Sequence, residues 1–385
     1  MIPYGRQTIS AEDIQAVVET LQSDWLTQGP AVERFERAVA EYCGSKFAVA
    51  VNSATSALHI ACLAAGLGEG DTLWTSPNTF VASANCGRYC GAAVDFVDID
   101  SRTYNLGPAC LAEKLEKAAE RNALPKVLVP VHFAGQSCDM AAIAELAGRY
   151  GITLIEDASH AIGGDYQGEK VGACVHSAMT VFSFHPVKIV TTGEGGMILT
   201  NRPELYERLL RLRSHGITRD PRRMAGESEG DWYYQQIELG FNYRMTDIQA
   251  ALGASQMKRL DEFVSRRRLL AGRYNELLAN LPLDLPWQHP DASSAWHLYT
   301  VRLQLDQIRS TRRQVFDALR RAGIGVNVHY IPVHLQPYYR EQGFKAGDFP
   351  LAERYYEEAI SLPLYFGLTD AQQAQVVNTL KEVLQ

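Results

Sequence analysis

The sequence contains no excess of basic residues and no pair of cysteines in CxxC spacing. Over 385 residues the formal net charge is −7, so the chain offers no broad positive field to nucleic acid or to an anionic membrane. Its seven cysteines lie largely within apolar segments. They are therefore expected to be reduced core residues of a cytoplasmic protein.

Signals for export and for membrane insertion are also missing. The start, MIPYGRQTIS, has no basic stretch that leads into an apolar one, and no uninterrupted run of about 18 apolar residues follows. The motifs HEXXH and GxSxG are absent, and no spacing of His, Cys and Asp fits a metal site. We expect a cytoplasmic protein that binds no metal, no nucleic acid and no membrane.

The first two thirds of the chain alternate short β-rich runs with helix-like segments. Several of the runs are apolar at nearly every residue, as strands covered on both faces must be. This alternation predicts an α/β fold with a largely parallel sheet between helices. Seven strands are expected: Phe47–Asn52, Thr72–Ser76, Ala93–Val97, Lys126–Val131, Ile152–Glu156, Met179–Phe184 and Gly196–Thr200.

The last third has a different pattern. Residues 247–281 read as one long helix, and shorter strand and helix patterns follow it. We predict a large domain of residues 1–260, which includes an N-terminal arm, and a smaller α/β domain of residues 261–385. The arginines at 266–268 fit a solvated helix face better than a phosphate site. The polar segment 218–232 has no periodicity and is expected to be a mobile loop.

One candidate phosphate site follows the first strand. The strand ends at Asn52-Ser53 and runs into the small residues Ala54 and Thr55 at the start of a helix. Free backbone N–H groups and the positive end of the helix dipole suit a phosphate there. An ordinary helix N-cap explains the same residues.

A second candidate group is Asp157, which ends the run ITLIED at the carboxyl edge of a predicted central strand. Open α/β sheets bind their ligands at that edge. A buried carboxylate needs a cationic partner, because an unpaired buried charge is costly. His160 is close enough in sequence to reach the same ligand. A helix cap is the competing interpretation for Asp157.

The third group is Lys188, which follows a strand that Ser183 closes and precedes a glycine cluster. A lysine in a concave, partly apolar site loses solvation, its pKa falls, and its neutral amine becomes a nucleophile toward carbonyl groups. The glycines allow a tight return into the next strand. A surface lysine beside a turn is the alternative.

The order of these groups resembles that of the fold-type I pyridoxal-phosphate (PLP) enzymes. The local sequences are similar to those of the DegT-type nucleotide-sugar aminotransferases, from Tyr4 to the final helix. The resemblance implies a fold-type I PLP-dependent transferase with a mostly parallel seven-stranded sheet and a smaller C-terminal α/β domain. The matching stretches are TQG, NSATSALH, EDASHAIG, SFHPVKIVTTGEGG, RSHGI, FNYRMTDIQAALG and VHYIPVH.

The resemblance assigns catalytic roles to three residues. Lys188 would hold PLP covalently through its amine and then serve as the acid–base catalyst of the proton shift. Asp157 would pair with the pyridine nitrogen and keep it protonated, so that the cationic ring acts as electron sink. His160 would lie near the phenolic oxygen of the cofactor.

The resemblance also implies how PLP is held. Ser183 and the turn at Ala54 and Thr55 would bind its phosphate, and Phe80 would stack on one face of its ring. Asn242 resembles the asparagine that a neighbouring subunit lends to the phosphate. A homodimer with a shared active site is therefore expected.

Further segments match those that line the nucleotide-sugar site in this family. We leave open whether His334 touches substrate or is a packed, satisfied histidine. The residues implied in substrate binding are Tyr4, Asp24, Trp25, Leu26, Thr27, Asn327, Val328, His329 and Tyr330.

These features imply a transamination in which L-glutamate gives its amino group to a UDP-keto-sugar. The sequences SHAIG, LTQG, SFHPVK and RSHG most resemble those of the transaminases of pseudaminic acid biosynthesis. These aminate C4 of a UDP-linked 4-keto-6-deoxy-L-N-acetylhexosamine, giving UDP-4-amino-4,6-dideoxy-N-acetyl-β-L-altrosamine. The alternatives are a D-configured UDP- or dTDP-keto-6-deoxyhexose as substrate and a non-catalytic regulatory PLP-binding protein. A sugar dehydratase is disfavoured, because such relatives replace the lysine with histidine.

Overall fold

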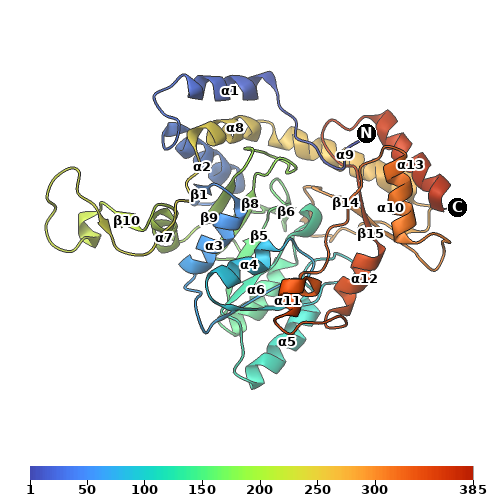
Figure 1. Cartoon of the computed structure of the whole chain (residues 1–385), viewed down its shortest axis with the longest axis horizontal. Helices are drawn as coiled ribbons and strands as arrows, with labels where there is room; N and C mark the ends of the chain where they lie inside the picture. Colours follow the sequence, from blue (N-terminus) through green and yellow to red (C-terminus); the bar gives the residue numbers. More distant parts are fainter. Residues whose placement is uncertain (385) are drawn as a thin grey trace.

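The computed structural model describes residues 1–384 and places a seven-stranded sheet at the centre of the molecule (Figure 1). The strand order is β1-β9-β8-β5-β4-β2-β3, and β9 runs antiparallel to both of its neighbours. The predicted mostly parallel sheet is confirmed, and each predicted range differs from its strand by no more than two residues at either end. The strands are β1 (Phe47–Val51), β2 (Thr72–Thr75), β3 (Ala93–Phe96), β4 (Val127–Val129), β5 (Thr153–Asp157), β8 (Met179–Ser183) and β9 (Gly196–Thr200).

Helices cover both faces of this sheet. Successive residues of a strand point to opposite faces, so each strand contributes side chains to both helix layers. Val127 and Ile155 join the core formed with α3 (Ala54–Ala64), α4 (Ala82–Tyr89) and α7 (Pro203–Arg213). Leu128 and Leu154 join the opposite core with α5 (Pro108–Glu120) and α6 (Met140–Arg149). On that side, α2 (Pro30–Cys43) and α8 (Asp247–Met257) cover β1, β9 and β8.

A smaller group of strands and helices follows α9 (Leu260–Leu278). Its antiparallel sheet has the order β12-β14-β15, and α9, α10 and α13 share one apolar core with it. The division of the chain near residue 260 stays a prediction. The elements are β12 (Leu283–Asp284), β14 (Tyr299–Leu303), β15 (Ala359–Leu362), α10 (Arg312–Arg321), α11 (Pro337–Arg340), α12 (Pro350–Glu358) and α13 (Asp370–Leu384).

Two expectations for the last third are wrong. The single helix predicted over residues 247–281 is two helices, α8 and α9, separated at Lys258 and Arg259. The arginines at 266–268 do not form a solvated face, because Arg267 is only 2% exposed. Its guanidinium donates to the carbonyl oxygens of Trp296, His297 and Leu364 at 2.9–3.2 Å, which supplies hydrogen bonds without an acidic partner.

Residues 214–240 form an arm that projects from the end of α7 (Figure 1). It contains the two-residue strands β10 (Ile217–Thr218) and β11 (Gln235–Gln236), paired antiparallel. Large apolar side chains such as Trp232 and Leu239 are more than 70% exposed on it. The predicted loop 218–232 lies within this arm.

The remaining elements lie at the periphery. Helix α1 (Ala11–Leu21) begins with a capping box at Ser10 and packs on α8. A small sheet joins β6 (Asp165–Tyr166), β7 (Glu169–Lys170) and β13 (Ala292–Ser293). Within residues 1–384, none of the helices combines the length and the apolar character needed to cross a bilayer.

Candidate active site

A cavity of about 570 Å³ lies where β5 and β8 end and α3 begins. This is the carboxyl edge of the parallel strands, where the candidate groups are predicted from the sequence. The cavity brings together nearly all residues expected at the cofactor and most of those expected at the substrate. The expected residues that line it are Tyr4, Ala54, Thr55, Phe80, Asp157, His160, Ser183, Lys188, Asn327, Val328, His329 and Tyr330.

Lys188 enters this cavity from the turn after β8. Its backbone N–H donates to the carbonyl oxygen of His185 at 2.9 Å, which closes the turn. Burial lowers the pKa of the Lys188 amine to about 8, although the charge of Asp157 partly opposes that shift. A substantial fraction of this amine is therefore neutral and nucleophilic near neutral pH.

Asp157, the last residue of β5, is 5% exposed. The Ser83 hydroxyl donates to its Oδ2 at 2.6 Å, and the Ser159 N–H donates to its Oδ1 at 3.1 Å. Because both oxygens already accept one bond, the carboxylate is held in a fixed orientation at the cavity wall.

His160 faces the same space as a neutral imidazole. Burial, together with the charge of Lys188, keeps its pKa well below the usual value. The Ala134 N–H donates to Nδ1 at 3.3 Å, so the ring proton is on Nε2, which lies 3.1 Å from the Tyr330 hydroxyl.

His329 is a second neutral histidine, and burial lowers its pKa to about 3. Its Nδ1 lies 2.8 Å from the Ser361 hydroxyl, and its Nε2 lies 3.3 Å from the Asn327 amide nitrogen. His334, in contrast, does not line the cavity. Its Nε2 lies 2.9 Å from a carboxylate oxygen of Glu353, so the side chain is packed, but its buried Nδ1 has no hydrogen-bond partner among the described residues.

His297 was not predicted from the sequence, yet it lines the cavity. Its ring centroid lies 4.4 Å from that of His160, and its Nδ1 is buried without a hydrogen-bond partner among the described residues. Burial and the charge of Lys188 keep the pKa of His297 well below its usual value. The one available signal was a histidine inside the apolar run WHLYTVRL, which also fits a strand.

The N-terminus of α3, a candidate anion site, lies in the lining of the same cavity. The Ser53 hydroxyl accepts the Ser56 N–H at 3.1 Å, so the N-cap interpretation of this turn is confirmed. The N–H groups of Ala54 and Thr55, in the first turn, have no intrahelical acceptor. The Ser183 hydroxyl lies in the same cavity lining. The turn at the start of α3 is therefore a helix N-cap and a candidate anion site at once.

Residues 24–27 do not reach the cavity of their own chain, in contrast to the other expected substrate residues. The Asp247 carboxylate accepts the Gly29 N–H at 2.9 Å, and the Asp247 N–H donates to the Thr27 carbonyl at 2.9 Å. These bonds hold the segment on the start of α8. Asn242 also lies outside the cavity, where it pairs with Ser214 at the base of the arm.

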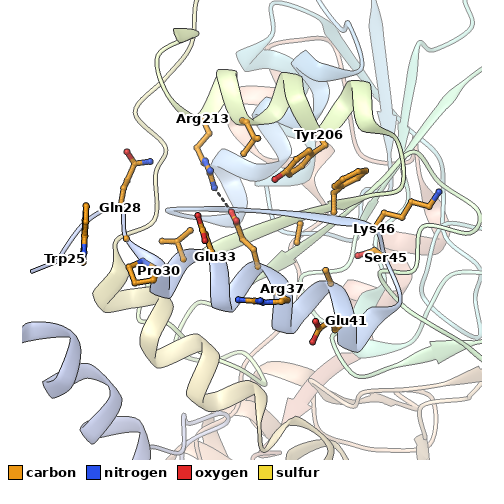
Figure 2. A pocket seen from close by; sticks show the side chains of 17 residues that line it. Trp25, Gln28, Pro30, Glu33, Arg37, Glu41, Ser45, Lys46, Tyr206 and Arg213 are labelled. Atoms are coloured by element: carbon orange, nitrogen blue, oxygen red, sulfur yellow. Dashed lines mark hydrogen bonds and ion pairs between the residues drawn. The ribbon is translucent and has the colours of Figure 1, made fainter. Parts of the chain in front are cut away.

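Trp25 borders a separate hollow of about 1010 Å³ between α2, β1 and α7. Figure 2 shows Trp25 and Gln28 at one end of this hollow and Arg213 on its wall. Arg213 forms an ion pair with Glu36 at 2.6 Å, and both side chains are mostly buried. Neither Asp157 nor Lys188 lines this hollow, so the smaller cavity is the better candidate for catalysis.

The donor set of the smaller cavity fits PLP. A lysine amine with a lowered pKa suits the aldehyde of the cofactor, a fixed carboxylate suits its pyridine nitrogen, and helix N–H groups with a hydroxyl suit its phosphate. Fold and cavity together define a PLP-dependent aminotransferase. The chain belongs to the DegT/DnrJ/EryC1/StrS aminotransferase family, which matches residues 7–381.

Known proteins are similar to this chain over its full length. The spore coat polysaccharide biosynthesis protein SpsC of Bacillus subtilis is 42% identical over 386 aligned positions, covering 100% of this chain and 97% of SpsC. The PLP form of Spr1654 from Streptococcus pneumoniae has a TM-score of 0.89 at 29% identity, covering 99% and 98% of the two chains. Helicobacter pylori PseC, an aminotransferase of pseudaminic acid biosynthesis, has a TM-score of 0.89 at 30% identity, covering 100% and 99%.

Proposed function

We propose that this sugar aminotransferase moves an amino group from L-glutamate to C4 of a UDP-linked 4-keto-6-deoxy-L-N-acetylhexosamine. The product would be UDP-4-amino-4,6-dideoxy-N-acetyl-β-L-altrosamine. The observation that carries the proposal is the amine of Lys188, with a pKa of about 8, in one cavity with Asp157. The similarity to PseC supports the choice of sugar. All seven cysteines are free, which suits the reducing cytoplasm in which we place the reaction.

The proposed roles follow from the chemistry of each side chain. PLP, when bound, supplies the electron sink that makes the Cα–H bond of the amino donor acidic. The neutral Nζ of Lys188 takes that proton and later returns one to the sugar carbon that receives the amine. Asp157 would balance the positive charge at the ring nitrogen, and His160 would lie beside the phenolic oxygen.

The other cavity residues bind and orient. The N–H groups at Ala54 and Thr55, with the Ser183 hydroxyl, hold the phosphate. Phe80, which is 59% exposed in the cavity lining, covers one face of the ring.

The sugar nucleotide would lie against the neutral polar groups of Tyr4 and residues 327–330. Residues 24–27 keep a proposed role in substrate binding only at a site shared between subunits, since they lie outside the cavity of their own chain.

The charge of the cavity supports a homodimer with a shared site. Lys188 is the only lysine or arginine in its lining within the described chain, and three of its four histidines, at 160, 297 and 329, are held neutral. The cofactor phosphate, the donor carboxylates and a nucleotide diphosphate are all anionic and need further donors. A second copy can supply them, with Asn242 as its proposed contact to the phosphate.

Asn242→Ala is expected to weaken retention of PLP about tenfold, the typical effect of losing one hydrogen bond to a charged group. The dissociation constant can be measured by absorbance during dialysis, with sedimentation to show that the dimer persists. Asn201→Ala, on the far end of β9, is a suitable control, because Asn201 bonds only to backbone atoms of Lys46 and Ala173. Unchanged retention in Asn242→Ala would remove the proposed contact.

The pH dependence of cofactor capture tests the assignment of Lys188. The amine must be neutral to attack, so the capture rate should be low below its pKa and should rise through about pH 8. An exposed lysine would instead give a rise near pH 10.4. Stopped-flow absorbance of the apoenzyme mixed with PLP measures this rate, and a rise centred near the exposed-lysine value would contradict the lowered pKa.

The substrate is tested by incubating the purified enzyme with L-glutamate and one keto-sugar nucleotide at a time. Turnover of the L-configured UDP sugar supports the proposal. Rapid turnover of a D-configured UDP- or dTDP-keto-6-deoxyhexose, with none of the L sugar, would replace it. If glutamate alone leaves the cofactor absorbance unchanged, the regulatory alternative is favoured.

A further inference from the structure

Two buried hydroxyl groups are linked by hydrogen bonds to the active-site carboxylate. Ser83 Oγ is 2.6 Å from Asp157 Oδ2, and Thr79 Oγ1 is 2.7 Å from Ser83 Oγ. Ser83 lies in the first turn of α4 and Thr79 lies just before that helix, and neither side chain is more than 2% exposed. The three groups thus form a short chain that runs from the base of α4 to the end of β5.

The direction of these hydrogen bonds follows from the chemistry of the groups. An ionised carboxylate only accepts, so the Ser83 proton is committed to Asp157. Thr79 must then donate to Ser83, which polarises the Ser83 hydroxyl toward the carboxylate. Because this bond ends on a charged acceptor, it is stronger than a bond between neutral groups.

Apart from the charge of Lys188 in the same cavity, Asp157 has little other support for its charge. No salt bridge to it is found in the part of the chain that the structure describes, and its Oδ1 accepts only the Ser159 N–H at 3.1 Å. A carboxylate offers about four acceptor positions, so those left over can meet a donor in the cavity. Together with the Ser159 N–H, the two hydroxyl groups therefore set the orientation of the carboxylate.

We propose that Ser83, supported by Thr79, is a positioning residue that holds Asp157 in the orientation in which it faces the pyridine nitrogen of PLP. The inference rests on the proposed role of Asp157 and extends it to Ser83, which lies outside the cavity lining, and to Thr79, which borders the cavity. The competing interpretation is that the hydroxyl groups only attach α4 to the sheet.

Ser83→Ala in the holoenzyme is expected to lower kcat about 10- to 100-fold while KM for glutamate changes little. The circular dichroism of the bound cofactor, which reports the seating of its ring, should weaken in the resting enzyme. Ser83→Thr retains the hydroxyl and should restore both kcat and the circular dichroism of the bound cofactor. Thr79→Val should lower kcat and weaken the circular dichroism of the cofactor, as Ser83→Ala does, but by a smaller amount.

Ser177→Ala is the matched control. Ser177 donates at 2.5 Å to Glu156, the residue before Asp157 on the same strand, so the variant removes an equivalent bond from a carboxylate outside the cavity lining. It should lower the unfolding midpoint and leave kcat and the cofactor signal unchanged. The proposal is overturned if Ser83→Ala behaves in the same way as Ser177→Ala.

A double variant separates this inference from the proposed function. If Ser83 acts through Asp157, adding Ser83→Ala to Asp157→Asn should cause no further loss. A further loss of full size would show that Ser83 acts independently and would refute the positioning role. If Asp157→Asn itself has no effect, the proposed role of Asp157 fails and the inference falls with it. A silent Ser83→Ala alone leaves the role of Asp157 intact.

Discussion

Lys188→Ala is expected to abolish turnover of every keto-sugar and to remove the covalent PLP adduct. The variant deletes the amine that the mechanism uses both to hold the cofactor and to move the proton. Another lysine cannot replace it, because Lys188 is the only lysine in the cavity lining within the described chain. Borohydride reduction followed by mass spectrometry should locate the adduct at residue 188 in the wild-type chain and find none in the variant.

The fold should survive this change. No hydrogen bond or ion pair of the Lys188 side chain is found among residues 1–384, so the free energy of unfolding of the apoenzyme should change by less than about 1 kcal/mol. Lys114→Ala is an informative control, because burial also lowers the pKa of Lys114, which instead pairs with Asp95 at 2.6 Å. That variant should retain the adduct. An adduct in Lys188→Ala, or one on another lysine of the wild-type chain, would disprove the assignment.

The central sheet was predictable from the sequence because its strands are covered on both faces. The run Phe47–Val51, for example, is apolar throughout, and a strand in that setting has no polar face that would produce an alternating pattern. Asp157, Ser183 and Lys188 could be assigned to one edge of the sheet because each lies at, or shortly after, the end of a predicted strand. Both inferences depend on local sequence and on the regular geometry of parallel strands.

Contacts between distant segments were not predictable in this way. Ser83 meets Asp157 across 74 residues of sequence, and nothing in the stretch FVASANC marks a hydroxyl that serves a carboxylate. His297 reaches the cavity because the backbone before β14 turns at Trp296, whose φ is +51°. Arg267 was misread since a charged triplet usually faces solvent, whereas here carbonyl oxygens satisfy the central guanidinium.

Asp157→Asn is expected to give an enzyme that still binds PLP but converts glutamate about a thousand times more slowly. Asn has nearly the same shape and can accept the Ser83 hydroxyl through its carbonyl oxygen, losing only the longer bond from the Ser159 N–H, so the cavity should persist. What is lost is the negative charge opposite the ring nitrogen. At about 4 Å and an effective dielectric constant near 20, that charge contributes about 4 kcal/mol.

The half-reaction with glutamate, followed by stopped-flow absorbance, measures this effect directly, and about 1.4 kcal/mol corresponds to each factor of ten. Glu156→Gln is the control, because Glu156 is the neighbouring carboxylate but pairs at 2.6 Å with His132 outside the cavity lining. Breaking that buried pair should reduce stability by about 3 kcal/mol and leave the rate of the half-reaction unchanged. If Asp157→Asn reacts at a rate close to that of the wild type, the ring nitrogen does not depend on this carboxylate. The electron sink would then need another source of negative charge.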